Sequence, residues 1–268
     1  MIIRQLSTAA AAVLIGVAST TSPAYAQPSD PAGCSALPSH GTLKAALDKA
    51  TAEEKSGLNN HMWATVVDRD GVVCAVAFSG TNRASQWPGS RVISAQKAST
   101  ANAFSLDPSS SSAGSGQADG LALSTANLYS AVQPGGSLFG LQLSNPVDTG
   151  AAYRGPYASY GTPKDPLTGS RVGGVNVFGG GLGLYAAARR TVGGLGVSGD
   201  TSCADHNIAW RIRNYLSLDH LMGVGGVSGD KARPDNIVFD IANGNSKGGF
   251  GHPQCLNTGD TSMLPGVR

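Results

Sequence analysis

Ser94 and Lys97 form the S-x-x-K pattern that carries the nucleophile of penicillin-interacting serine enzymes. Those enzymes also contain an S-x-N motif and a K-[ST]-G motif. This sequence has no S-x-N, and Lys247 is followed by two glycines, so the required hydroxyl is missing. An S-x-x-K pattern alone is common on helices. We therefore interpret Lys97 as a capping or snorkelling side chain and set the serine-enzyme hypothesis aside.

A second pattern, Gly194-Leu-Gly196-Val-Ser-Gly199, matches the G-x-G-x-x-G fingerprint of dinucleotide-binding sites. Asp219 follows at about the twenty-residue spacing that the fingerprint requires. However, Asp200 comes directly after the last glycine, where its charge would repel a phosphate. No further strand–helix–strand unit follows in the sequence. In a chain with 37 glycines, we attribute the match to chance.

Asp205 and His206 are the adjacent pair best suited to acid–base or metal chemistry. Both lie in the first turn of a helix that we predict over residues 204–216. A helix N-terminus disfavours the imidazolium, which leaves a nitrogen lone pair of His206 free for a metal, although the neighbouring carboxylate opposes this effect. Two alternatives stay open: the pair serves as the acid and base of an enzyme, or His206 only caps the helix.

The other four histidines have different expected surroundings. His61 opens a predicted strand at one end of a sheet. His252 lies in a loop beside Cys255, from which it could reach a pocket. His40 is expected to be solvated, and His220 is expected to pack against the fold.

The four cysteines indicate two disulfides. They lie too far apart along the sequence for the C-x₂₋₄-C pairs of structural zinc sites. Three pairings are possible. We favour Cys34–Cys74 and Cys203–Cys255, because neighbouring segments usually lie adjacent in space.

The composition and the N-terminus point to an exported globular protein. The 268 residues carry a net charge of +2 and are 41% hydrophobic, which allows a real core and gives no basic footprint for nucleic acid. Residues 1–26 resemble a secretory signal peptide, with Arg4, an apolar run over 9–18 and the Ala24-Tyr25-Ala26 cleavage site. That run is shorter than the roughly 20 residues of a membrane span. We therefore expect a periplasmic or secreted protein without a membrane span.

The hydrophobic pattern predicts helices over residues 43–55, 90–104 and 204–216, the first of them capped by Thr42. It predicts a hairpin of strands 62–67 and 72–78, with Asp70-Gly71 as its turn, and further strands over 172–185 and 191–198. A short helix near 121–132 and a last strand over 238–241 are also expected. This order predicts an α+β fold in which helices flank an antiparallel sheet.

Residues 105–170 interrupt this pattern. They contain a low-complexity stretch, Ser109–Ser112 and Gly114–Gly116, and then a segment rich in glycine, proline and tyrosine. A segment of this length is either a functional lid or an insertion that packs its own aromatic side chains. We therefore divide the chain into a signal peptide (1–26), a flexible segment (27–41) and one domain (42–268), which contains this insertion and a C-terminal extension over 217–268.

Five short segments, in order, resemble the GlcG/HbpS family of haem-binding proteins. They are TVVDRDGVV at 65–73, PGS at 88–90, QKASTA at 96–101 with Phe104 after it, GGLGVSG at 193–199 and DHNIA at 205–209. The resemblance covers about half of the mature chain and implies a profilin-like fold, haem as ligand and homo-oligomers. Ser99 stands where the family often has arginine. The insertion and the region after 217 exceed the usual family length.

For a haem-binding member, the resemblance makes His206 the first candidate for the iron ligand, with His61 and His252 next. Ser90, in the family-like Gly-Ser pair, is expected to cap the second helix at the site. Arg91 and Lys97 either pair with the haem propionates or are solvated helix charges. The tyrosines of the insertion either stack on the ligand or form the core of their own loop.

We predict an exported protein with disulfides that binds haem or another small ligand, for carriage, scavenging or sensing. Two alternatives belong to other classes. One is an enzyme that acts on a small organic molecule under the insertion, with Asp205 and His206 as acid and base. The other is a partner-binding module without a small ligand.

Overall fold

A central antiparallel sheet organises the structure, a computed structural model that describes residues 33–108 and 119–268. The predicted signal peptide and the whole low-complexity stretch lie outside the described residues. The sheet has the strand order β2-β1-β4-β3. Its strands are β1 (Trp63–Asp68), β2 (Val73–Phe78), β3 (Gly181–Ala186) and β4 (Arg190–Ser198). Nearly all of their residues are buried, which shows that both faces of the sheet are covered.

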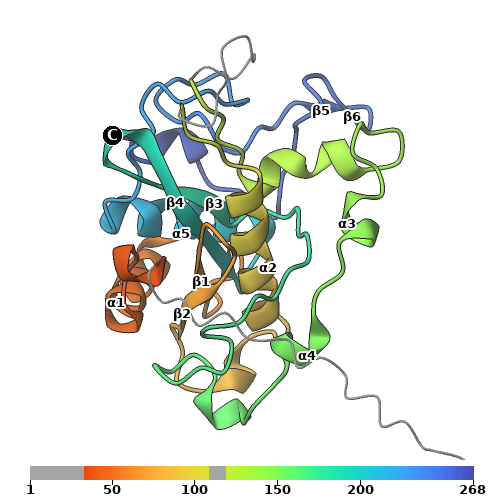
Figure 1. The fold of residues 1–268 in the computed structure, drawn as a ribbon. Helices are drawn as coiled ribbons and strands as arrows, with labels where there is room; N and C mark the ends of the chain where they lie inside the picture. Colours follow the sequence, from red (N-terminus) through yellow and green to blue (C-terminus); the bar gives the residue numbers. More distant parts are fainter. Residues whose placement is uncertain (1–32, 109–118) are drawn as a thin grey trace, which may run out of the picture.

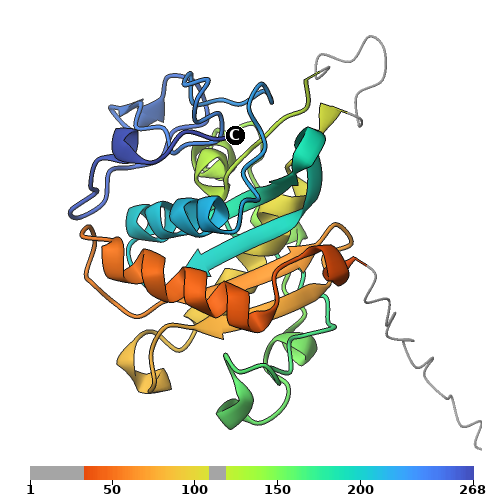
Figure 2. The ribbon, with the colours of Figure 1, turned by 90° about the vertical axis from the view of Figure 1, so that its left-hand side faces the viewer.

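Three helices of 14 residues cover the two faces. The helices α1 (His40–Glu53) and α5 (Ser202–Tyr215) lie side by side on one face, and α2 (Ser90–Ala103) lies on the other (Figures 1 and 2). The predicted α+β fold with an antiparallel sheet and flanking helices is therefore confirmed. No helix among the described residues is long and apolar enough to cross a membrane.

The glycines of β4 allow α2 to lie directly on the sheet. A Cβ added at Gly196 would lie 1.9 Å from the carbonyl oxygen of Ser94, and one at Gly194 would lie 2.2 Å from that of Ala98. Both distances are far shorter than any real contact. The G-x-G-x-x-G pattern is thus a helix-packing surface of a strand, which explains why it occurs without a dinucleotide fold.

Residues outside this frame form short turns. The insertion follows the α2 side of the molecule (Figure 1). It contains α3 (Leu141–Ser144), α4 (Thr149–Ala152) and the 3-10 turns Thr125–Leu128, Ser130–Val132 and Tyr157–Ser159. The C-terminal extension contains β5 (Ile241–Ala242), β6 (Asn245–Ser246) and the 3-10 turn Thr261–Met263. Further 3-10 turns cover Cys34–Ala36, Arg83–Ser85 and Ala187–Arg189.

Several predicted boundaries change. The first helix begins at His40 and is capped by Ser39 rather than by Thr42. Only the last part of the strand expected over 172–185 forms, because Gly173 and Gly174 both take positive φ and interrupt the extended backbone. The helix expected near 121–132 is two 3-10 turns, and only Ile241 of the strand expected over 238–241 is in a strand.

Two disulfides join the additions to the frame. Cys34 pairs with Cys74 and Cys203 pairs with Cys255, with Cα–Cα distances of 5.3 and 6.0 Å. This is the pairing that the adjacency of neighbouring segments favoured. The first disulfide attaches the segment before α1 to β2, and the second attaches the C-terminal extension to the first turn of α5.

Candidate functional site

A cavity of about 310 Å³ lies where the N-terminal turns of α2 and α5 meet the end of β4. This volume is at the lower end of the range of ligand pockets. We call it the α2–α5 cavity. Its lining includes Trp87, Ser90, Lys97, Phe178, Ser202 and Asp205. Three of these residues, Ser90, Lys97 and Asp205, were candidates from the sequence.

Two aromatic side chains at this cavity are about half exposed to solvent. Trp87 is 51% exposed and Phe178 is 45% exposed. Gln86, just before Trp87, is buried, and neither of its amide atoms has a hydrogen-bond partner. Exposed aromatic faces beside a concave site can stack on a flat ligand. Trp87 and Phe178 could not be predicted from the sequence, because a single aromatic residue in a loop carries no periodic signal.

A buried ion pair joins α2 to α5 at the cavity. Lys97 Nζ lies 2.6 Å from Asp205 Oδ2, and it also donates to the carbonyl oxygen of Val197 at 3.0 Å. Asp205 Oδ1 accepts the backbone N–H of Asp200. Burial raises the pKa of Asp205 to about 6 and lowers that of Lys97. These two contacts engage two of the three ammonium hydrogens, and the third can meet a ligand oxygen.

Ser94 does not pair with Lys97, although the two share the S-x-x-K pattern. Its Oγ donates to the carbonyl oxygen of Arg91 at 2.7 Å and lies 2.7 Å from Thr65 Oγ1. The hydroxyl therefore bonds within the helix and to β1. This geometry agrees with setting the serine-enzyme interpretation of the motif aside.

Ser202 and His252 form a second polar pair at the cavity. Ser202 Oγ lies 2.7 Å from His252 Nε2, and His252 Nδ1 lies 2.6 Å from the carbonyl oxygen of Pro253. Burial lowers the pKa of His252. The sequence held no local motif for a pair 50 residues apart. Cys203 and Cys255, which lie near them in the sequence, could have predicted that Ser202 and His252 meet, because a disulfide between the cysteines brings the two segments together.

His206 points away from the cavity into the protein interior. Its side chain is fully buried, and Nε2 accepts the backbone N–H of Ile237 at 3.3 Å. Nδ1 has no hydrogen-bond partner. Burial lowers the pKa of His206 to about 4, so the ring is neutral at pH 7. Its place as first iron ligand does not fit this geometry, because the ring lies in the interior and none of its hydrogen-bond partners lines the α2–α5 cavity.

The enzyme hypothesis for Asp205 and His206 does not fit the geometry either. The carboxylate of Asp205 faces Lys97, whereas the ring of His206 lies beside Asn236 and Trp210. Adjacent residues of a helix point in different directions, so the two groups cannot share a proton. His206 does not cap the helix, since Thr201 caps α5.

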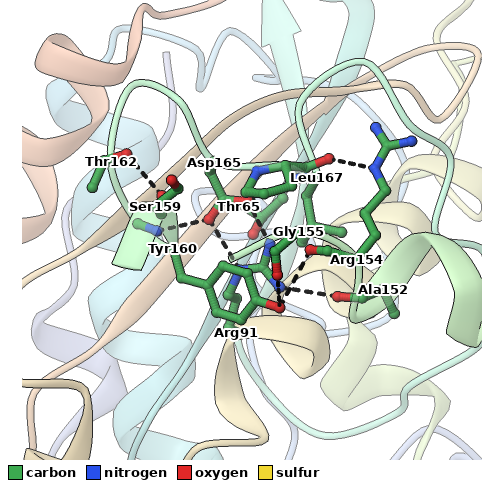
Figure 3. A network of polar contacts seen from close by, with 12 residues as sticks. Thr65, Arg91, Ala152, Arg154, Gly155, Ser159, Tyr160, Thr162, Asp165 and Leu167 are labelled. Atoms are coloured by element: carbon green, nitrogen blue, oxygen red, sulfur yellow. Dashed lines mark hydrogen bonds and ion pairs between the residues drawn. The ribbon is translucent and has the colours of Figure 1, made fainter. Parts of the chain in front are cut away.

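Arg91 holds the insertion and is not free for a ligand carboxylate (Figure 3). Its Nε and Nη2 donate to the two carboxylate oxygens of Asp165, at 2.9 and 2.5 Å. Nη1 donates to the carbonyl oxygen of Ala152 at 2.9 Å, and the ring of Tyr160 lies 3.6 Å from the guanidinium carbon. The pairing of Arg91 with haem propionates therefore does not fit this geometry, because each of its three nitrogens already has a partner.

The tyrosines of the insertion do not form a common core. Tyr160 stacks on Arg91, while Tyr153 and Tyr157 are 60% and 64% exposed. None of these tyrosines lines the α2–α5 cavity. The described part of residues 105–170 therefore shows neither a lid over this cavity nor a core formed by its own aromatic side chains.

The remaining residues predicted from the sequence differ in their burial and in their contacts. Ser90 lines the cavity as the first residue of α2, but Gly89 is the N-cap and no side chain caps the helix. His61 is exposed, lies 3.5 Å from Ser79 Oγ and does not line the cavity. His40, expected to be solvated, bonds the carbonyl oxygen of Gly161 at 2.8 Å. His220 is half-buried.

Comparison with solved structures finds similar chains of low identity. The Klebsiella pneumoniae protein ORFY is 25% identical, with 66% of this chain and 86% of that chain covered and a TM-score of 0.42. PduOC in complex with haem is 22% identical, with 67% and 94% covered and a TM-score of 0.43. A double mutant of HbpS from Streptomyces reticuli is 17% identical, with 78% and 99% covered and a TM-score of 0.39. No curated protein matches the chain.

The family model of HbpS-like haem degrading proteins matches residues 40–213. This range runs from the start of α1 to the last turn of α5, so it contains the four strands of the central sheet, the insertion and every residue that lines the cavity. The family resemblance of the sequence motifs is thereby confirmed. The chain belongs to the HbpS-like family of haem degrading proteins.

Proposed function

We propose that this protein binds haem in the α2–α5 cavity. The observation that carries the proposal is the pair of half-exposed aromatic side chains, Trp87 and Phe178, beside the buried ammonium of Lys97. A flat, largely apolar ring with carboxylate arms needs these two kinds of group. Membership of a family described as haem degrading supports the same ligand.

The residues present fit haem in three respects. Trp87 and Phe178 offer faces for the macrocycle, and Lys97 offers an N–H to a propionate oxygen. Ser90 Oγ lines the same cavity. Of the five histidines, only His252 is hydrogen-bonded to a side chain that lines the cavity. We assign it as the iron ligand, reached when Nε2 gives up the Ser202 hydroxyl. Bound haem would supply iron for ligand exchange or electron transfer.

The proposed place of action is outside the cytoplasm, in the periplasm or as a secreted protein. Two disulfides support export, since such bonds persist in oxidising compartments. The predicted signal peptide accords with this, although it lies outside the described residues. Carriage, scavenging or sensing of haem are the roles that suit such a protein, as a homo-oligomer of the kind that the resemblance implies.

A haemin titration followed in the Soret band tests the proposal. We expect a saturable one-to-one shift, and roughly fivefold weaker binding after Trp87→Ala or Phe178→Ala, since stacking contributes about 1 kcal/mol. His252→Gln should move the Soret maximum, whereas His206→Gln, which changes a histidine outside the cavity, should leave both affinity and spectrum unchanged. A protein that shows no saturable shift at micromolar haemin, or whose cavity variants bind as tightly as the unchanged chain, would contradict the proposal.

A further inference from the structure

The hydrogen bonds of His252 set the direction of its contact with Ser202. The carbonyl oxygen of Pro253 can only accept, so His252 Nδ1 must carry the hydrogen in their 2.6 Å contact. Nε2 then holds the lone pair, and the hydroxyl of Ser202 donates to it at 2.7 Å. This is the arrangement in which a histidine can remove the proton of a hydroxyl nucleophile.

The chain holds this pair rigidly from both sides. Cys203 follows Ser202 directly and is bonded to Cys255, three residues after His252. Ser130 bonds the carbonyl oxygen of Gly251 through both its backbone N–H, at 3.2 Å, and its Oγ, at 2.6 Å. The N–H of Gly179 donates to Ser202 Oγ at 2.6 Å and fixes the serine rotamer. A pair held in this way requires little reorganisation before it reacts.

The two residues differ in their access to a ligand. Ser202 lines the α2–α5 cavity and is half-buried, so an electrophile in the cavity can reach its Oγ. His252 is 4% exposed and lies behind the serine, shielded from water. Its Nδ1–H is bonded to the carbonyl oxygen of Pro253, which leaves the lone pair of Nε2 toward Ser202 Oγ. Lys97 lines the same cavity and supplies a positive charge that can stabilise an oxyanion.

We propose that Ser202 is an activated nucleophile, with His252 as its general base, and that it forms a covalent acyl intermediate with small aryl esters in the α2–α5 cavity. The aryl group is inferred from Trp87 and Phe178 at the cavity. This activity belongs to the haem-free protein and does not depend on the proposed haem function.

The reaction follows the usual course of acyl transfer. Ser202 Oγ bonds to the ester carbonyl carbon, and its proton moves to His252 Nε2. The bond from that carbon to the aryloxy oxygen then breaks, and the aryloxide leaves with the proton from His252. Water, deprotonated by His252, attacks the acyl carbon. The bond to Oγ then breaks as His252 returns the proton to Oγ, and the acid is released with the serine restored.

Phenylmethanesulfonyl fluoride is a direct probe, because its aromatic group suits the cavity. Ser202 Oγ displaces fluoride at sulfur, the proton goes to His252, and one phenylmethanesulfonyl group stays on the protein. We expect the haem-free protein to gain one such group, located by peptide mass mapping on Ser202. Hydrolysis of p-nitrophenyl acetate should be faster than in buffer and should stop after labelling.

Two variants and one matched control decide the outcome. Ser202→Ala should remove the label, and His252→Gln should slow labelling about a hundredfold or more, the usual contribution of a general base. Ser79→Ala is the control: Ser79 and His61 are also in contact, but at 3.5 Å and with an exposed histidine. It should react like the unchanged chain. Near-UV circular dichroism shows whether each variant is folded.

A positioning role without nucleophilic chemistry would give different results. If the folded, unchanged protein takes up no label on Ser202, or if folded His252→Gln reacts at the same rate, the proposal is overturned. If Ser202→Ala fails to fold because the Gly179 contact is lost, the mapped label and the His252→Gln rate still decide the matter.

Discussion

Replacing Arg91 by methionine should destabilise the protein strongly without weakening haem binding. The side chains of Arg91 and Asp165 are 2% and 0% exposed, so the change leaves a buried carboxylate without its cation. Losing one partner of a buried ion pair costs about 3–5 kcal/mol. Asp165 keeps the N–H groups of Gly161 and Leu167, at 2.7 and 2.9 Å, which places the expected loss near 3 kcal/mol.

Urea unfolding measured by intrinsic fluorescence gives the free energy of unfolding of each variant. Asp165→Leu should also be destabilising, whereas the double variant that combines Arg91→Met with Asp165→Leu should lose clearly less than the sum, because an apolar pair no longer buries a lone charge. In the cold, where Arg91→Met remains folded, the haemin affinity should match that of the unchanged chain. A loss below about 1 kcal/mol, additive effects, or a large drop in haemin affinity would refute the structural role given to Arg91.

Three further predictions concern stability. The lowered pKa of His206, about 4, means that the unfolded chain binds a proton first as the pH falls below about 6.5. The stability that the neutral His206 ring contributes is complete above pH 6.5. Between pH 6.5 and pH 4 the free energy of unfolding falls by about 3 kcal/mol because of this residue. The raised pKa of Asp205 changes the free energy of unfolding in the opposite direction over the same pH range. The contribution of His206 is therefore measured by comparing urea unfolding of His206→Gln with that of the unchanged chain at pH 7 and at pH 4. If His206→Gln and the unchanged chain differ in free energy of unfolding by the same amount at pH 7 and at pH 4, this prediction is contradicted. Replacing both Cys203 and Cys255 by alanine should cost about 4 kcal/mol for a cross-link of separation 52, measured by urea unfolding, and slow labelling of Ser202. Gly196→Ala should abolish the native fold or cost about 3 kcal/mol or more in thermal unfolding, and a near-native melting temperature would show that α2 lies further from β4 than described.

The frame of the fold could be predicted because each of its elements carries a local signal. The stripe Leu43, Ala46, Leu47 and Ala50 is buried on α1, as helical spacing requires. The turn at Asp70-Gly71 joins β1 and β2, and Gly71 takes the positive φ that such a turn needs. The strand predicted over 172–185 is too long. The β-branched residues of this range favour a strand, but the two consecutive glycines interrupt it.

The candidate site could be predicted only in part, because its contacts are non-local. Lys97 and Asp205 were chosen as separate candidates, but their ion pair joins residues 108 apart. Arg91 was expected either to pair with a ligand carboxylate or to be a solvated helix charge, and its partner Asp165 lies in the insertion, where the sequence shows no periodicity. His206 followed the helix pattern correctly, but the pattern could not tell which side of α5 faces the cavity and which faces Asn236.

Anomalous X-ray scattering from iron in crystals grown with haemin tests the central claim most directly. The account predicts one strong iron peak in the α2–α5 cavity, within bonding distance of His252 Nε2 and between Trp87 and Phe178. A peak beside His61, a peak elsewhere on the surface, or an ordered cavity without iron in crystals that contain haemin would contradict it.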